Sequence, residues 1–176
     1  MNTRVAIEKE YWDKAALDPD VDKKYIADCD LQGCLDAIGN LKGKVLDLGC
    51  GVGRLMKDGY CGVDISPNML KIAAKRHPSC EFKLADGRTI PYPDETFDSA
   101  YSMLLFQHLP FDAVGGYIKE VRRVLKDNGI FIFQYIEGTE DEPFSKHHII
   151  ELEGFTFGTE KELVHPQWTW IRANKI

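Results

Sequence analysis

The stretch VLDLGCGVG at positions 45–53 limits the possible folds of this chain more than any other part of its sequence. Three glycines stand at every second position, directly after a short apolar run that contains one acid, Asp47. A short, nearly continuous apolar run is typical of a strand that is buried on both faces of a parallel sheet. Glycines directly after such a strand let the backbone turn tightly and come close to a ligand. The stretch therefore predicts an α/β fold with a ligand-binding turn behind its first strand.

Two kinds of ligand compete for this turn: a dinucleotide, or another molecule that carries adenosine. The dinucleotide pattern is GxGxxG, in which the last glycine lets a helix pack closely on the strand. Here the glycines form GxGxG, and Arg54 stands where the last glycine of the dinucleotide pattern would be. Because an arginine is too large for that close packing, a nicotinamide-dependent oxidoreductase is the weaker hypothesis.

After this turn the sequence alternates between strand-like and helix-like segments. The apolar patterns predict strands at 44–48, 60–65, 80–85, 96–104 and 130–136, and helices at 66–77, 113–127 and 145–154. Ser66 is expected to cap the first of these helices, and Asn128–Gly129 to end the second. Two further β-rich runs, 155–164 and 167–174, are expected to pair as a hairpin.

This order of segments predicts a Rossmann-like, doubly wound α/β sheet that is mainly parallel, with an antiparallel hairpin at its C-terminal edge. Ahead of the sheet, positions 7–38 should form two helical pieces that are separated at Pro19. Ligands of such sheets bind beyond the carboxyl ends of the strands. Asp64 and Asp86 end the second and third predicted strands. Asp64 could accept hydrogen bonds from two ribose hydroxyls, and Asp86 from an adenine amino group.

Composition narrows the classes of partner and the cell compartment. The chain has 176 residues, which suits one domain, and a formal net charge of −6. That charge, with no run of five Lys or Arg residues, argues against a nucleic acid or an anionic membrane as partner. Five cysteines without a CxxC pair fit reduced thiols and no metal site. No apolar run approaches the ~20 residues of a membrane span, so we expect a cytoplasmic protein.

Together these residues closely resemble the class I S-adenosylmethionine-dependent methyltransferases, most of all the small-molecule, type 11 kind. The resemblance covers about residues 41–133. VLDLGCGVGRL is similar to the first motif of that family, GVDISPNML to its acidic ribose motif, and ADGRTIPYPDETFDSAYSMLLFQHL to its adenine and fourth-strand motifs. The resemblance implies S-adenosylmethionine as cofactor, S-adenosylhomocysteine as product, and no metal.

The resemblance also implies which residues meet the cofactor. They are Asp47, Gly49, Cys50 and Gly51 in the first motif, Asp64, Ile65 and Met69 in the second, and Asp86, Gly87, Ser102 and Met103 after the third and fourth strands. Gly49 and Gly51 would approach the methionyl part, and Ser102 and Met103 would lie beside its amine. Cys50 is expected to pack in the loop as a small residue rather than to act as a nucleophile.

One spacing departs from the family pattern. Only 11 positions separate Gly53 from Asp64, where the family usually has a full helix. The helix expected there is therefore shortened, which could open one wall of the cofactor cleft. This departure motivates a second hypothesis: a protein that binds S-adenosylmethionine or S-adenosylhomocysteine without catalysing transfer.

In-line transfer of an activated methyl group depends mainly on alignment and desolvation, so the sequence singles out few catalytic residues. His108 and Gln107 follow the fourth strand, near the expected place of the methyl group, and His108 could act as a base. Tyr11 lies in the N-terminal segment, which in this family often folds over the cofactor. Tyr135, at the end of the fifth strand, could face the acceptor.

The resemblance implies a single domain over residues 1–176. It would comprise an N-terminal helical lid at 1–40, a cofactor-binding core at 41–136, and a C-terminal helix and β-hairpin at 137–176. The Asn/Asp-Pro-Pro-Tyr motif of base-amino methyltransferases is missing after the fourth strand. We therefore expect a small-molecule methyl acceptor, no nucleic acid or membrane, and a monomer or homodimer.

Overall fold

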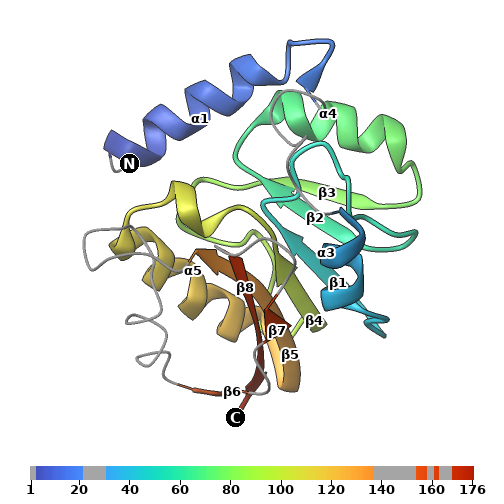
Figure 1. Ribbon diagram of the computed structural model, residues 1–176, viewed down its shortest axis with the longest axis vertical. Helices are drawn as coiled ribbons and strands as arrows, with labels where there is room; N and C mark the ends of the chain where they lie inside the picture. The colour runs from blue at the N-terminus through green and yellow to red at the C-terminus, as the bar shows by residue number, and fades with distance from the viewer. Residues whose placement is uncertain (1–2, 22–30, 137–153, 158–160, 163–167) are drawn as a thin grey trace.

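A mostly parallel sheet forms the centre of the protein (Figure 1). The computed structural model describes residues 3–21, 31–136, 154–157, 161–162 and 168–176. The strands of the described part are β1 (Val45–Leu48), β2 (Cys61–Asp64), β3 (Glu81–Leu84), β4 (Phe97–Ser102), β5 (Leu125–Ile136), β6 (Phe155–Phe157), β7 (Lys161–Glu162) and β8 (Trp168–Lys175). They follow the order β3-β2-β1-β4-β5-β8-β6, and β7 also pairs with β8.

The direction of pairing changes once across this sheet. Strands β1 to β5 pair in parallel with their neighbours. Strand β8 is antiparallel to β5, β6 and β7. The strand order reverses between β1 and β4, which is the switch point at which α/β sheets bind ligands. The predicted doubly wound, Rossmann-like sheet with an antiparallel C-terminal edge is therefore confirmed.

Helices cover both faces of the sheet. Within the described residues they are α1 (Thr3–Ala15), α3 (Leu31–Ile38), α4 (Pro67–Arg76), the 3₁₀ turn η1 (Phe106–His108) and α5 (Phe111–Val124). Successive residues of a strand point to opposite faces. Leu46 accordingly packs in the core that contains α5, whereas its neighbour Val45 packs in the core that contains α3.

The N-terminus of α4 forms as its local sequence predicts. Ser66 is the N-cap residue, and its hydroxyl oxygen accepts a hydrogen bond from Met69 N at 3.1 Å. Pro67 occupies the first turn, where its fixed φ favours the helix. Both devices act within a few residues, so they need no tertiary contact.

The end of α5 differs from the prediction. The helix stops at Val124 rather than continuing to 127, and Leu125 is already extended, with ψ 140°. Leu125 is fully buried and pairs with Phe97 of β4, so packing on the sheet ends the helix early. Asn128, with φ 61°, makes a left-handed turn inside β5 instead of a helix terminus.

The linker between β1 and β2 contains no helix at all: residues 49–60 form turns. The sequence predicts a shortened helix here, and the structure has only turns in its place. Leu55, Met56 and Tyr60 of this linker are buried in the core that contains α3. Three side chains on turns thus cover a part of the sheet that a helix would otherwise cover. The predicted helix at 145–154 lies, apart from Gly154, outside the described residues.

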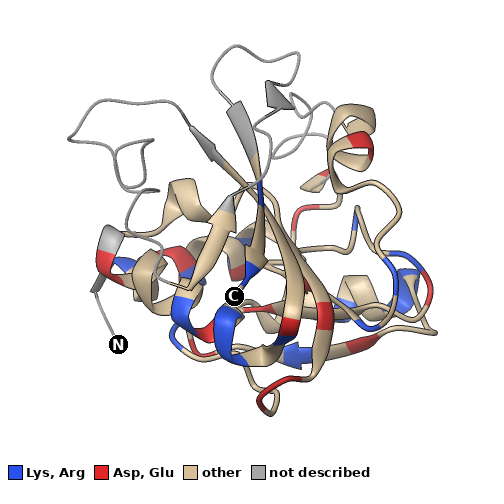
Figure 2. Ribbon diagram, turned by 90° about the horizontal axis from the view of Figure 1, so that it is seen from below, with Lys and Arg blue, Asp and Glu red and all other residues tan. Residues whose placement is uncertain are grey.

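Acidic and basic residues are interspersed along the ribbon in the view of Figure 2. No stretch of a single sign dominates this view. Among the helices that the structure describes, none is both long and apolar enough to cross a membrane.

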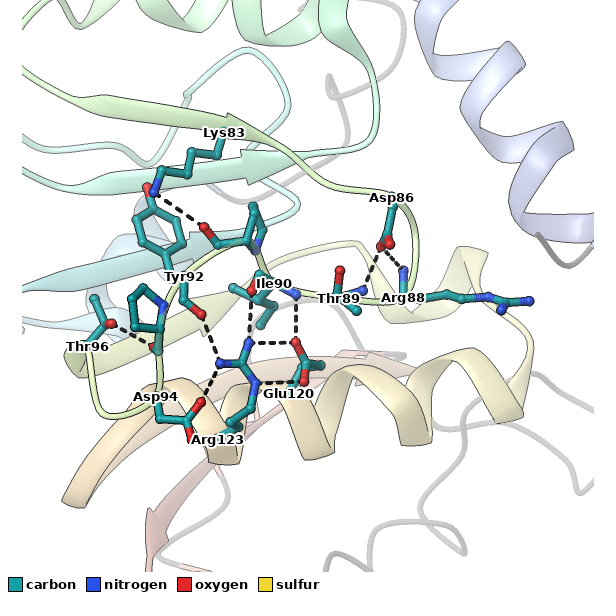
Figure 3. A network of polar contacts seen from close by, with 12 residues as sticks. Lys83, Asp86, Arg88, Thr89, Ile90, Tyr92, Asp94, Thr96, Glu120 and Arg123 are labelled. Carbon is teal, nitrogen blue, oxygen red and sulfur yellow. Dashed lines mark hydrogen bonds and ion pairs between the residues drawn. The ribbon is translucent and has the colours of Figure 1, made fainter.

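Arg123 of α5 holds the segment that connects β3 to β4 (Figure 3). Its five N–H donors all find acceptors: two bonds go to the Glu120 carboxylate, and one each to Ile90 O, Tyr92 O and Asp94 Oδ1, at 2.7–2.9 Å. The Glu120 carboxylate in turn accepts a hydrogen bond from Ile90 N at 2.8 Å. A planar fork of donors is required for this arrangement, which lysine cannot supply.

We therefore expect Arg123→Lys to lower the free energy of unfolding by about 1–3 kcal/mol, although the charge is kept. Urea unfolding followed by circular dichroism measures this difference. Arg122→Lys, on the exposed side of the same helix, is the matched control and should change stability little. Equal effects of the two substitutions would contradict the role of the Arg123 fork.

Candidate active site

A cavity of about 640 Å³ lies at the carboxyl ends of β1, β2 and β4. This volume falls in the range of roughly 300–1,000 Å³ that is usual for small-ligand sites. The turn after β1, the end of β2, the loop after β4 and helix α1 all contribute to its wall. Of the residues that the sequence predicts for the site, those that line the cavity are Tyr11, Asp47, Gly49, Cys50, Gly51, Asp64, Ile65, Met69, Gly87, Met103, Gln107 and His108.

Two positions in the turn after β1 require glycine, each for a different physical reason. A Cβ at Gly53 would lie 2.9 Å from His77 Cδ2 and 3.3 Å from Ala73 Cβ, so this glycine lets α4 pack closely. A Cβ at Gly51 would meet no protein atom within 4 Å, because Gly51 faces the cavity. Both residues have positive φ, 80° and 51° respectively, which favours glycine. The turn thus lacks a side chain at Gly53 so that α4 can pack against it, and at Gly51 so that a ligand can approach the backbone.

Asp64 joins this turn to the start of α4. Its Oδ2 accepts a hydrogen bond from Gly51 N at 2.9 Å, and its Oδ1 accepts one from Ser66 N at 2.8 Å. Burial raises the pKa of this carboxyl, while the hydrogen bonds from backbone N–H groups oppose that shift. The carboxylate lines the cavity, and its oxygens can accept further hydrogen bonds from a ligand. Such a group can bind a diol, as the sequence predicts for ribose.

Asp47 is the most deeply buried acid of the site, at 3% exposure. The Tyr101 hydroxyl lies 3.0 Å from Asp47 Oδ2 and 3.1 Å from Leu55 O. Within the described residues, no cation and no backbone N–H is hydrogen-bonded to this carboxyl. Burial raises the pKa of Asp47 to about 8; the Tyr101 hydrogen bond opposes the shift and the nearby Asp64 charge adds to it. At neutral pH the Asp47 side chain is therefore mainly protonated.

Helix α1 closes the open side of the cavity and lies near α4 (Figure 1). At its C-terminal part, Asp13 Oδ1 accepts hydrogen bonds from Ser66 Oγ at 2.9 Å and Asn68 N at 3.1 Å. A carboxylate at the N-terminus of α4 also interacts favourably with the helix dipole. At its N-terminal part, the buried Val5 packs so closely on Gly87 that no Cβ would fit there.

The predicted catalytic candidates lie on two sides of the cavity. His108 and Gln107 belong to η1, and Tyr11 lies on α1 at 49% exposure, on the rim. The His108 ring stands edge to face against Trp12, with 5.2 Å between ring centroids. Burial lowers the pKa of His108, so the imidazole is held neutral and able to accept a proton.

Comparison with known proteins supplies the family. A family model described as a methyltransferase domain matches residues 46–133. The chain belongs to this methyltransferase family. The sterol 4-C-methyltransferase strm-1 of Caenorhabditis elegans is 31% identical over 136 residues, which make up 69% of this chain and 40% of that protein. The 2-methyl-6-phytyl-1,4-hydroquinone methyltransferase of Synechocystis sp. is 35% identical over 98 residues, 50% of this chain and 30% of that protein.

Among solved structures, the DhpI–SAM–HEP complex superposes with a TM-score of 0.79 and covers 98% of both chains at 20% identity. At that identity the likeness shows the fold. The chain spans less than half the length of the two curated methyltransferases that it matches. The predicted methyltransferase family is confirmed by the family match, and the predicted fold by this superposition.

Two predicted cofactor residues of this methyltransferase domain are not among those that line the cavity. Asp86 is exposed, and its Oδ1 accepts hydrogen bonds from Arg88 N and Thr89 N at 2.8 and 2.7 Å (Figure 3). Ser102 is buried, and its hydroxyl donates to Leu48 O at 2.9 Å, which ties β4 to β1. Their contacts with the cofactor stay predictions. Tyr135 belongs to β5, but its side chain lies outside the described part of the structure.

Several residues of the site escape prediction from sequence. Glu8 on α1 and Tyr117 on α5 line the cavity, and Leu105 fills the space that a Cβ at Gly49 would need. Tyr101 sits in an apolar strand pattern, so nothing local distinguishes it from a core residue. For Glu8 the available signal was its position three residues before Tyr11, because this spacing places two residues on the same face of a helix.

We expect Gly51→Ala and Gly53→Ala to separate binding from stability. Gly51→Ala should cost about 1–2 kcal/mol of stability, because a left-handed residue gains a Cβ, and should weaken cofactor binding by filling the cavity. Gly53→Ala adds a clash with α4, so it should cost about 1–3 kcal/mol more. Urea unfolding and calorimetric titration measure the two effects. A Gly51→Ala variant that binds as the wild type does would contradict the place of Gly51 in the site.

The Asp47 carboxyl should make stability depend on pH. Its folded pKa is about 8 and its unfolded pKa about 3.8, so between these values the native state binds the extra proton. The contribution of the Asp47 carboxyl to the free energy of unfolding is full below pH 3.8. It is lost as the pH rises to 8, at up to ~1.4 kcal/mol per pH unit. Asp47→Asn should therefore gain stability relative to the wild type between pH 5 and pH 8 in urea unfolding. The exposed Asp58→Asn serves as control, and a parallel pH profile in both variants would count against a raised pKa.

Proposed function

We propose that this chain transfers the methyl group of S-adenosylmethionine to a small-molecule acceptor. One observation carries the proposal: a single cavity joins the glycine turn and Asp64 with His108. The glycine turn and Asp64 suit an adenosine-bearing cofactor, and His108 can serve as a proton acceptor. Membership in the methyltransferase family supports the reaction class.

The residues of the cavity fit the proposed cofactor. Asp64 presents two oxygens to ribose hydroxyls, while Gly49 and Gly51 leave space for the methionyl part. Ile65 and Met69 can supply apolar surface to the adenine ring, since both line the cavity. The low-dielectric surroundings of Asp47 hold a carboxyl that ionises when a positive charge comes near. When bound, S-adenosylmethionine supplies a methyl group on a cationic sulfur.

The proposed transfer is an in-line displacement. A lone pair of the acceptor atom forms a bond to the methyl carbon, and the carbon–sulfur bond breaks with its electron pair going to sulfur. The proton of the acceptor atom passes to His108 Nε2. Gln107 and Tyr11 also line the cavity, from η1 and α1, and can orient the acceptor. Such alignment can contribute about 7–11 kcal/mol to lowering the barrier.

A small acceptor is favoured by the surroundings of His108. Apolar and aromatic side chains line the cavity, among them Trp12, which packs against His108, and also Leu109 and Tyr117. The two related proteins named above act, by their names, on a sterol and on a hydroquinone, which supports a ring-bearing or apolar acceptor. The proposal includes a lid at 1–40, a core at 41–136 and a cytoplasmic location, with a helix and hairpin at 137–176.

Calorimetric titration with S-adenosylmethionine, S-adenosylhomocysteine and, as control, NAD tests the cofactor. The first two should bind and NAD should not. Asp64→Asn should weaken binding about 10- to 100-fold, because it replaces a charged hydrogen-bond acceptor for ribose. No binding of either adenosyl compound would overturn the proposal.

A screen of small-molecule acceptors with radiolabelled S-adenosylmethionine then tests the chemistry. Transfer should fall by about 10²–10⁴-fold in His108→Gln, while cofactor affinity stays unchanged. Binding without transfer to any acceptor would favour the second hypothesis, a protein that holds the cofactor without catalysis.

A further inference from the structure

Two acid–base groups from distant parts of the chain lie close together in the lining of the cavity. Glu8 of α1 and His108 of η1 both line it, with their side chains 13% and 33% exposed. Glu8 Oε2 lies 3.9 Å from His108 Nδ1. In proteins without bound substrate, catalytic hydrogen bonds are often long and shorten in the complex. The distance is therefore compatible with a carboxylate that orients an imidazole.

Glu8 is itself held in place from two sides. Trp12 Nε1 donates a hydrogen bond to Glu8 Oε2 at 3.2 Å, and Arg4 Nε lies 3.3 Å from Glu8 Oε1. Trp12 also packs its ring against His108. One aromatic side chain thus fixes the carboxylate and the imidazole relative to each other. Salt bridges on the solvent side of the helix, such as Lys14–Glu10, lack this burial.

The neighbours of His108 assign its tautomer. Gln107 Nε2 lies 3.3 Å from His108 Nε2, and an amide nitrogen can only donate. With the Gln107 amide in this orientation His108 Nε2 accepts, and the carboxylate of Glu8, which can only accept, favours a proton on Nδ1. Nδ1 is the nitrogen that faces Glu8. The arrangement leaves the lone pair of Nε2 in the cavity, where an acceptor hydroxyl or amine can replace the Gln107 amide.

Charged groups around His108 act in opposite directions on its pKa. Burial has the largest effect and lowers the pKa; the Glu8 carboxylate raises it, and the Arg4 guanidinium lowers it. All the charges that act on it in this way belong, among the described residues, to α1. The charges that modify the proton affinity of His108 therefore come from a helix that lies outside the sheet.

We propose that Glu8 is a positioning residue for His108 in the proposed reaction. This role rests on the function proposed above. Glu8 holds the Nδ1–H tautomer of His108 and stabilises the imidazolium that forms when His108 Nε2 takes the proton of the acceptor. The proton later leaves to water, which restores the neutral ring. Because Glu8 belongs to α1, the base is complete only while α1 covers the cavity.

Nitrogen NMR of the uniformly ¹⁵N-labelled protein tests this role without any cofactor or acceptor. Two-bond ¹H–¹⁵N spectra distinguish the two tautomers of each of the five histidines, and the signals lost in His108→Gln assign His108. The wild type should show a protonated Nδ1 and a bare Nε2. Glu8→Ala should lose this preference, and Glu8→Gln should lower the pKa of His108 in an NMR titration, because a neutral amide replaces the carboxylate.

Glu10→Gln is the matched control, since it removes one negative charge from the same helix at an exposed position. It should leave both the tautomer and the pKa of His108 unchanged. A protonated Nε2 in the wild type would overturn the proposal, and so would equal pKa values in Glu8→Gln and Glu10→Gln. If Glu8→Ala does not fold, the wild type and Glu8→Gln still decide. Failure of cofactor binding is a separate result, which would overturn the proposed function but not the tautomer.

Discussion

The Asp64 carboxylate is the contact on which the rest of the site depends. It ends β2 and accepts one N–H from the turn after β1 and another from the cap of α4. Three segments are thereby fixed relative to one another at the switch point of the sheet. No helix lies between β1 and β2, and the turn is also held by hydrogen bonds from Gly49 N and Cys50 N to Val63 O, at 2.8 and 3.0 Å. Close packing of α4 on Gly53 and burial of Leu55 add to these contacts.

Asp47 and Asp64 share the cavity with Arg54, but within the described residues no ion pair is formed with either acid. Asp47 and Asp64 both have raised pKa values, chiefly because of burial, and the charge of Asp64 raises the pKa of Asp47 further. A buried carboxyl of this kind is costly to ionise unless a cation lies near it. A cationic methyl donor is a ligand that meets this condition, whereas its thioether product carries one positive charge less. The two acids would thus favour the cationic methyl donor over its thioether product.

Local signals predicted much of this molecule, and long-range packing accounts for what they missed. The Ser66 cap and the strand that precedes Gly49 follow from residues a few positions apart. The early end of α5 does not, because it depends on Leu125 packing against β4. The Tyr101–Asp47 hydrogen bond links residues 54 positions apart, and Tyr101 in sequence is one more aromatic residue in a strand. The shortened β1–β2 linker was visible from spacing, but its loss of all helical structure was not.

The two halves of the proposed chemistry come from different parts of the fold. The cofactor side is built from strand ends and a turn at the centre of the sheet. The acceptor side is completed by α1, whose Val5 packs on Gly87 and whose Ala15 belongs to a buried cluster with Val52 and Met69. The same helix therefore brings the Glu8 carboxylate to His108 and packs on residues of the proposed cofactor side. Placement of the proposed base and cover of the cofactor thus depend on one packed helix.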